Sequence, residues 1–405
     1  MNSTSENNKK RKSIFTSKIT LIIEGLITAI IISEIFLRII GFSNPLFYEY
    51  DELLGWKLRP NASGWFQKEG GAYIEINSQG LRDREHNFKK PDTVLRIAVL
   101  GDSYAEAMTL PVEETFWSIT EKKLNEIKPY NNKTVEVINF GVGGYGTDQE
   151  FLQLKRDVWN YSPDIIILTF FAGNDIRNNC RELDLSTGKP YFTLENNALI
   201  LDTNFNKRSE IKKFISNMGK YPQRLFSQYS RLYQLYKLYK DYKHNMEISQ
   251  QVSGDTIAGQ EIGIGDAVYS KPTDPKWEKA WAITETLIVK MSEEIKAKNA
   301  YFIVLPATTS IQVHPDTNIR NQYIKKMNIK NLAYPEDRIK ILGDTFGFKV
   351  IPLIKNFQVY AEQNKKYLHG YENLKLGFGH WNREGHSLAA EIIVNYILTN
   401  YKNIK

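Results

Sequence analysis

The chain has 405 residues, of which 42% are hydrophobic and 24% charged, and it contains 23 Tyr, 20 Phe and 7 Trp. This length and composition suffice for a full hydrophobic core, which excludes a small disulfide-stabilised scaffold and a wholly disordered chain. The lone cysteine, Cys180, excludes an internal disulfide and a Cys-x-x-Cys metal site, and no histidine pair has the His-Glu-x-x-His spacing. We therefore expect neither a bound metal nor a cofactor.

The formal net charge of +7 is concentrated in two segments. Residues 1–18 carry five basic residues and one acidic residue, and residues 206–245 carry ten basic and two acidic residues, so the rest of the chain is net acidic. A nucleic-acid-binding domain spreads its basic residues over a surface with a recognisable motif, and the sequence has none. We therefore expect no nucleic-acid partner and interpret both basic segments as related to a membrane.

The first predicted element is a helix over residues 19–40, in which 14 of 22 residues are Ile, Leu or Phe. At 1.5 Å per residue it is about 33 Å long, enough to cross a ~30 Å hydrocarbon layer. Glu24, Glu34 and Arg38 oppose insertion, but none of them is central. All three fall on one stripe of the helix, which can face a partner helix or reach toward the interface.

The residues around this helix predict its orientation. A basic run at residues 9–12 precedes it, and no small-residue cleavage site follows it. By the positive-inside rule, residues 1–18 are a cytoplasmic tail, residues 19–40 are an uncleaved single-pass signal anchor, and the rest lies on the non-cytoplasmic side, periplasmic or extracellular. A cleaved signal peptide and an interfacial amphipathic helix on the cytoplasmic side are the alternatives.

Two regions follow the anchor. Residues 46–92 combine short alternating stretches with Gly- and Asn-containing turns, which predicts a small β-rich collar. In residues 93–403, five short apolar runs alternate with helical stretches, which predicts a parallel sheet covered on both faces, a three-layer α/β/α fold. The predicted strands are Leu95–Leu100, Val135–Phe140, Ile165–Phe171, Tyr301–Leu305 and Val350–Leu353.

Residues 178–274 break this alternation, and we interpret them as an insertion. The basic part of the insertion has apolar residues at helical spacing, namely Leu225, Tyr229, Leu232, Tyr236 and Tyr239. This spacing predicts an amphipathic helix that packs on the core with its basic face in solvent. A lid or a membrane-surface helix is the alternative.

Ligands of a parallel α/β sheet bind beyond the carboxyl ends of its strands, so the chemistry is expected directly after each apolar run. Ser103 follows the first strand in a Gly-Asp-Ser turn that can present its hydroxyl. The glycine-rich residues 141–146 follow the second strand and let backbone amides approach a ligand. Asn174 follows the third strand, and His380 precedes the last helix, where it is placed to act as a general base. Taken singly, each feature is also explained as a turn, a helix cap or a loop.

Taken in order, Gly-Asp-Ser, Asn-x4-Gly, Gly-Asn-Asp and His-x-Asn-x2-Gly resemble the four blocks of the SGNH (GDSL) hydrolase family. The resemblance covers residues 94–400 apart from the insertion, and it implies a flavodoxin-like five-stranded parallel sheet. The anchor and collar are similar to those of membrane-anchored bacterial members, notably cyanobacterial ones. By this resemblance Ser103 is the nucleophile and His380 its base. The oxyanion hole is formed by the backbone N–H groups of Ser103 and Gly144 and the side chain of Asn174.

One position departs from the family pattern. The family has an aspartate three residues before the histidine, and this chain has Gly377 there. A backbone carbonyl can orient His380 instead, or a carboxylate from elsewhere can, with Glu372 the nearest upstream candidate. A degenerate site is the third alternative, but the retention of serine, histidine and both oxyanion donors argues against it.

These observations predict an exported, membrane-tethered serine esterase that acts through an acyl-serine intermediate on O-acyl groups of envelope glycans or lipids. Two alternatives stay open. One is an O-acyltransferase that passes the acyl group to a polysaccharide hydroxyl, and the other is a non-catalytic glycan-binding module of the same fold. The expected partners are an ester-bearing small molecule, lipid or glycan, and the membrane.

Overall fold

A five-stranded parallel sheet forms the centre of the computed structural model, which describes residues 2–130, 133–184, 188–196, 198–202, 225–252 and 266–401. The strand order is β11-β10-β7-β5-β6. The strands are β5 (Val94–Gly101), β6 (Thr134–Asn139), β7 (Ile165–Phe170), β10 (Tyr301–Pro306) and β11 (Lys349–Val350). The predicted parallel sheet is therefore confirmed.

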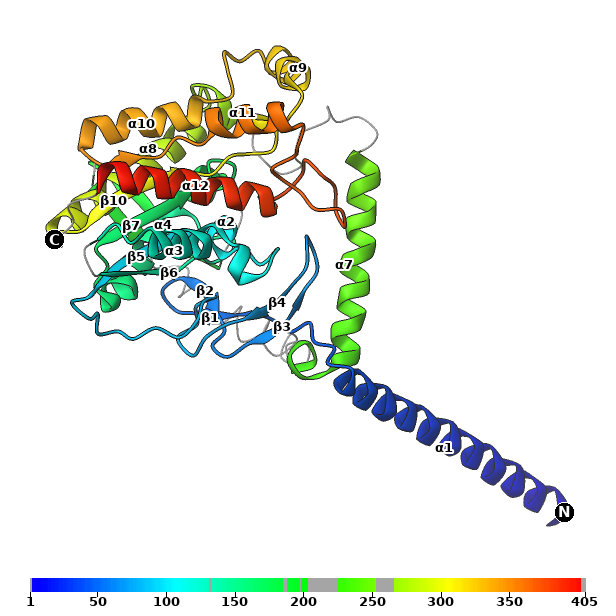
Figure 1. Cartoon of the computed structure of the whole chain (residues 1–405). Helices are drawn as coiled ribbons and strands as arrows, with labels where there is room; N and C mark the ends of the chain where they lie inside the picture. Colours follow the sequence, from blue (N-terminus) through cyan, green and yellow to red (C-terminus); the bar gives the residue numbers. More distant parts are fainter. Residues whose placement is uncertain are drawn as a thin grey trace.

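Helices cover both faces of the sheet, as Figure 1 shows. Because successive residues of a strand point to opposite faces, Ile97 and Val99 pack into one buried cluster and Ala98 and Leu100 into the other. The first cluster lies under α3 (Phe116–Ile127), α11 (Ile354–Asn364) and α12 (Arg383–Asn400). The second lies under α4 (Thr147–Arg156), α8 (Pro275–Ala297) and α10 (Tyr334–Phe346). Burial on both faces explains why the strands are continuous apolar runs.

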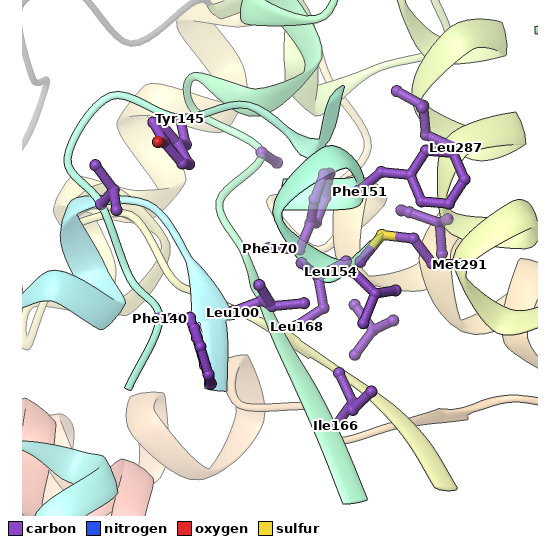
Figure 2. Close-up of a cluster of buried hydrophobic side chains, with 14 of the residues drawn as sticks. Leu100, Phe140, Tyr145, Phe151, Leu154, Ile166, Leu168, Phe170, Leu287 and Met291 are labelled. Atoms are coloured by element: carbon purple, nitrogen blue, oxygen red, sulfur yellow. The ribbon is translucent and has the colours of Figure 1, made fainter. Parts of the chain in front are cut away.

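Figure 2 shows part of the second cluster, where Leu100, Leu168 and Phe170 of the sheet lie near Leu154 of α4 and Met291 of α8. Every one of these side chains is fully or almost fully buried. Buried side chains of this size stabilise a fold by about 1.5–3 kcal/mol each. The carboxyl ends of β5 and β7 are therefore held on a tightly packed base, and the residues that follow them inherit fixed positions.

The last strand is shorter than predicted. It covers only Lys349–Val350, although the backbone N–H of Ile351 still donates to the carbonyl of Val304 over 3.0 Å. The next residue is Pro352, which has no N–H and so cannot continue the ladder. The predicted strand Val350–Leu353 is thus wrong in its extent.

The collar consists of two antiparallel hairpins, β1 (Tyr48–Asp51) with β2 (Gly55–Leu58), and β3 (Ser63–Phe66) with β4 (Ala72–Glu75). Leu54, Leu58 and Ile74 of these hairpins belong to the same buried cluster as Leu100 of the sheet. The collar therefore packs on the core of the sheet rather than standing apart from it.

Helix α1 (Asn2–Ile39) projects away from the body of the protein (Figure 1). Its segment Lys18–Ile39 has 22 residues with a mean hydropathy of 2.1, is not buried, and is long and apolar enough to cross a membrane. A signal sequence near the N-terminus has the same properties.

The insertion contains the hairpin of β8 (Tyr191–Glu195) with β9 (Ala198–Asp202), and helix α7 (Arg231–Val252), which stands beside the body (Figure 1). The first part of the basic segment, residues 206–224, lies outside the described residues. Tyr229, Tyr236 and Tyr239 are 60%, 58% and 56% exposed. The prediction that this stripe packs on the core is therefore wrong, because the helix lies beside the sheet domain rather than on it.

The remaining helices are short or lie at the edge of the body. They are α2 (Ser103–Glu106), α5 (Asp175–Asn178) and α9 (Thr317–Met327), with 3-10 turns at Val112–Glu114, Val158–Tyr161, Asp266–Tyr269 and Ile311–Val313. Of these, α2 and α5 begin at the carboxyl ends of β5 and β7, where the sequence analysis places the chemistry.

Candidate active site

Ser103 and His380 meet above the carboxyl end of β5. The Oγ of Ser103 lies 2.7 Å from Nε2 of His380, although 277 residues separate them in the chain. Gly101 makes the turn before the serine possible, because a Cβ there would lie 2.9 Å from that of Thr169 on the neighbouring strand. The Asp102 side chain then accepts from the backbone N–H of Tyr104 and caps α2. The two residues predicted to be nucleophile and base are thus within hydrogen-bond reach of each other.

A carboxylate lies on the other side of the histidine, and it is that of Glu69. Its Oε2 lies 2.6 Å from Nδ1 of His380, and its Oε1 accepts from the backbone N–H of His380 over 2.6 Å. Glu69 lies in the turn between β3 and β4 of the collar. The carboxylate named from the sequence, Glu372, is instead exposed and lines a separate surface hollow with Gly70 and Arg383. The structure thus brings Ser103, His380 and Glu69 into one line of hydrogen bonds.

Gly379, directly before the histidine, accommodates this distant acid. Gly379 has φ +83°, and a Cβ on it would overlap Oε1 of Glu69. Gly377, which stands in place of the family's aspartate, has φ +79°. His369 stabilises the loop, because its Nδ1 lies 2.8 Å from the carbonyl oxygen of Gly379. The departure at Gly377 therefore goes together with a loop in which the next glycine, Gly379, leaves room for a carboxylate from the collar.

Glu69 is ionised in this position. It is only 8% exposed, and burial by itself raises the pKa of a carboxyl. Electrostatic attraction to His380 and the two hydrogen bonds from it outweigh burial and hold the pKa of Glu69 below its usual value. By contrast, burial lowers the pKa of His369 to about 4, so this second histidine is neutral near pH 7. The ionised carboxylate of Glu69 accepts a hydrogen bond from Nδ1 of His380. This favours the tautomer of His380 in which Nδ1 carries the proton and Nε2 is free to accept one.

The predicted oxyanion donors Gly144 and Asn174 lie in the segments that follow β6 and β7, the strands on either side of β5. Gly144, in the loop after β6, has φ +80°, and Gly141 of the same loop lies so close to α2 that a Cβ would overlap the backbone of Ala105. Asn174 follows β7, and its Nδ2 donates to Oδ2 of Asp102 over 2.7 Å. An amide nitrogen carries two N–H groups, so this bond fixes the side chain and leaves a second donor.

The collar also holds the loop that carries Gly144. Nε1 of Trp56 donates to the carbonyl oxygen of Gly143 over 3.0 Å. The hydroxyl of Tyr48 donates to the carboxylate of Glu106, at 2.8 and 2.9 Å from its two oxygens. Burial raises the pKa of Glu106 to about 7, although the backbone N–H of Gly143 and the Tyr48 hydroxyl both lower it. The collar thus contributes a carboxylate next to His380 and two hydrogen-bonding side chains, Trp56 and Tyr48, that hold the loop after β6 and its neighbour Glu106 in place. We call the loop after β6, which carries Gly144, the oxyanion loop.

The other histidines serve the fold. His386 is buried, its Nδ1 accepts from the backbone N–H of Phe116 over 3.2 Å, and burial lowers its pKa to about 3. His86, His314 and His369 are likewise buried and bonded. The side chain of His244 lies outside the described residues. Among the residues whose side chains are described, no three His, Cys, Asp or Glu gather so as to hold a metal ion.

No protein-family model matches the sequence, and no curated protein sequence does. The structure is similar to solved structures that cover about three quarters of the chain. An acetyl xylan esterase, AlAXEase, is 14% identical with a TM-score of 0.37, covering 75% of this chain and 100% of its own. A lipase/acylhydrolase from Enterococcus faecalis is 13% identical with a TM-score of 0.34, covering 75% and 96%.

A third such structure is a GDSL-like lipase from Bacteroides thetaiotaomicron, 13% identical with a TM-score of 0.31, covering 75% of this chain and 88% of its own. GDSL is the family that the four sequence blocks resemble. Identities and TM-scores this low do not assign a function, and the function proposed below therefore rests on the geometry of the site.

Proposed function

We propose that the protein is a serine esterase in which Ser103 is the nucleophile, His380 the general base and Glu69 the orienting acid. The observation that supports this is the continuous line of hydrogen bonds from Oγ through the imidazole to the carboxylate, with both contacts at 2.6–2.7 Å. A serine hydroxyl is inert until a base takes its proton, and a base is effective when a third group fixes its tautomer. The alternative of a non-catalytic glycan-binding module rested on the absence of an acid at Gly377. In the proposal Glu69 takes the place of that acid.

In the proposed reaction, Oγ of Ser103 attacks the carbonyl carbon of the ester while Nε2 of His380 takes its proton. The oxygen that becomes negative is stabilised by the backbone N–H groups of Ser103 and Gly144 and by the free N–H of Asn174. As the C–O bond breaks, His380 returns the proton to the leaving alcohol, and an acyl-serine forms. A water then attacks the acyl-serine with the same base, which releases the acid and restores the serine.

The substrates that fit the proposal are O-acyl groups of envelope glycans or lipids. An acyltransferase differs only in the second step, where a sugar hydroxyl replaces water. Product analysis with and without a glycan acceptor separates the two. No step uses a metal, so we expect activity to survive chelation.

We also propose that α1 is an uncleaved anchor and that the catalytic domain lies on the non-cytoplasmic side. The length and hydropathy of Lys18–Ile39 support a membrane span, and the basic run at residues 9–12 before it supports a cytoplasmic N-terminus. Protease protection of the N-terminal tail in sealed vesicles tests this orientation.

The test of the activity is hydrolysis of a short p-nitrophenyl ester together with labelling by a fluorophosphonate. We expect both to be abolished in Ser103→Ala and hydrolysis to be lost in His380→Ala, with circular dichroism unchanged. His386→Ala is the matched control, because this histidine packs against Phe116 and not against the serine. Full hydrolysis by Ser103→Ala would refute the proposal.

A further inference from the structure

The two charged side chains near the end of the apolar span of α1 are bound by the protein itself. Oε1 of Glu34 accepts from the backbone N–H of Arg231 over 2.8 Å, and Oε2 accepts from that of Leu232 over 3.1 Å. Arg38 bonds to Glu34 over 2.9 Å and donates to the carbonyl oxygen of Tyr229 over 2.5 Å. Glu34 therefore caps the start of α7, and the part of the polar stripe formed by Glu34 and Arg38 has its partner in residues 229–232.

The loop after α1 strengthens this junction. Nη1 of Arg231 donates to Oγ of Ser43 over 2.8 Å, and the backbone N–H of Asn44 donates to Oε1 of Gln234 over 2.9 Å. Hydrogen bonds to a charged group are stronger than those between neutral groups, and stronger still where water is excluded. The start of α7 is thus bound to the end of α1 and to the loop after it at several points. The depth of α1 in a membrane therefore also determines the depth of the start of α7.

That depth lies within the apolar span. Glu34 is five residues before Ile39, the end of the span, which is about 8 Å along the helix axis. Residues 229–232, which bind Glu34, are therefore placed level with apolar residues of α1 rather than beyond them. An ionised side chain at this level is tolerated when its partners are brought with it.

The surface at this junction is apolar on both sides. Leu225, Phe226 and Tyr229 are 39%, 55% and 60% exposed, and they face Ile31 and Ile35 of α1, which are 52% and 51% exposed, across a hollow of about 490 Å³. Exposed Leu, Phe and Ile side chains at this density are unfavourable in water, because contact between apolar surface and water costs free energy. Lipid acyl chains remove that cost for both walls of the hollow at once.

Resting on the anchor proposed above, we propose that residues 225–232 are a second membrane-inserted segment. They lie in the non-cytoplasmic half of the bilayer that α1 crosses, and lipid acyl chains fill the hollow between them and α1. Tyr229 and Tyr236 then lie at the level where tyrosines collect in membranes, and Lys237 and Lys240 lie near the headgroup phosphates. Continuity with the apolar surface of α1 favours lipid over a second copy of the chain as the occupant.

This placement also sets the distance from the bilayer to the proposed active site. Asp241 of α7 lies 3.6 Å from Nζ of Lys68, the neighbour of Glu69. Ten residues of helix separate Arg231 from Asp241, which is about 15 Å. An ester on a glycan or headgroup above the membrane fits this distance.

The lone cysteine makes a direct test possible. Cys180 is fully buried, and burial raises the pKa of its thiol to about 11, so it does not react with a maleimide near pH 7. The full-length protein carrying Phe226→Cys is labelled with an environment-sensitive fluorophore and reconstituted into phosphatidylcholine vesicles with or without doxyl-labelled lipid. Ile31→Cys on α1 is the reference for insertion, and Ile341→Cys on α10, which is 66% exposed, is the control outside the membrane.

We expect the doxyl lipid to quench the label at position 226 as strongly as the label at position 31, and to leave position 341 unquenched. Adding Glu34→Ala should lessen the quenching at position 226 and not at position 31. Quenching at position 31 alone overturns the proposal and leaves the anchor standing, whereas no quenching at either position overturns both. Self-quenching between copies at position 226 without lipid quenching identifies a second copy as the occupant and also overturns it. Hydrolysis of p-nitrophenyl acetate by the same labelled variants reports the proposed activity separately.

Discussion

Glu69→Gln tests the part of the site that the sequence does not reveal. Glutamine keeps the shape of the side chain and can still accept from the backbone N–H of His380 through its carbonyl oxygen. Its NH₂ group, however, then faces Nδ1 of the imidazole, where Oε2 of the carboxylate lies 2.6 Å away in the native chain. This arrangement favours a proton on Nε2, and the imidazole can no longer take the proton of Ser103.

The size of the effect follows from the same contact. When His380 becomes an imidazolium during the reaction, its attraction to Glu69 at 2.6 Å is about 6 kcal/mol with an effective dielectric constant of 20. At 1.36 kcal/mol per factor of ten, loss of this term lowers kcat by roughly 10⁴-fold. A loss of this size is typical when the acid of a serine triad becomes an amide.

The assay is kcat and KM for a p-nitrophenyl ester across pH 5–9, with fluorophosphonate labelling of Ser103 as a second readout. We expect kcat to fall and KM to change little, because Glu69 touches the histidine and not the substrate. Glu372→Gln is the matched control, since that carboxylate is exposed and lies apart from the imidazole, and its kcat should stay close to that of the native chain. A full loss in Glu372→Gln, or native kcat in Glu69→Gln, would refute the reasoning.

Three further predictions concern the surroundings of this acid. Gly379→Ala should lower kcat by about 10²-fold or more, because the new Cβ displaces the carboxylate of Glu69. Gly347→Ala is the control: Gly347 has a similar positive φ but lies in open space, so this change should affect only stability, by about 1 kcal/mol. Trp56→Phe should lower kcat about tenfold in steady-state kinetics and change the melting temperature by no more than a few degrees, because it removes the hydrogen bond from Trp56 to the carbonyl oxygen of Gly143. Trp65→Phe, on the other hairpin, is the control and should leave kcat unchanged. Glu106 has a pKa raised from 4.5 to about 7, so the native state binds its proton more tightly, and its stabilising contribution is complete below pH 4.5 and lost as the pH rises through 7. Urea unfolding at pH 5 and pH 8 should therefore show that Glu106→Gln removes a pH-dependent difference of roughly 2–3 kcal/mol, and an unchanged difference would contradict the assignment.

The sheet and two of the three residues of the proposed triad, Ser103 and His380, were predictable because their signals are local. Strands buried on both faces appear as unbroken apolar runs, and the residues after them, such as Ser103, are fixed by the strand ends. The limit of this reasoning appears at β11, where Pro352 shortens a run that is apolar throughout.

Glu69 was not predictable, because the contact joins residues 311 apart through an irregular turn. Its local sequence, with Gly70 and Gly71 after it, looks like any polar hairpin turn. The one available signal was indirect: the usual acid position is a glycine, and a second glycine, Gly379, stands directly before His380. Likewise, the helical spacing of the tyrosines in α7 indicates a helix face but does not say whether that face meets protein, water or lipid.

The hairpin that carries Glu69 also bears on how this chain can be divided. A shortened protein that begins at residue 93, where the composition changes from collar to alternating strands and helices, keeps the serine, the glycine loop and the histidine. It has lost the carboxylate at Nδ1 and the tryptophan over the oxyanion loop. In the proposed mechanism the boundary visible in the sequence is therefore not a functional boundary, and we expect activity only where collar and sheet are expressed as one unit.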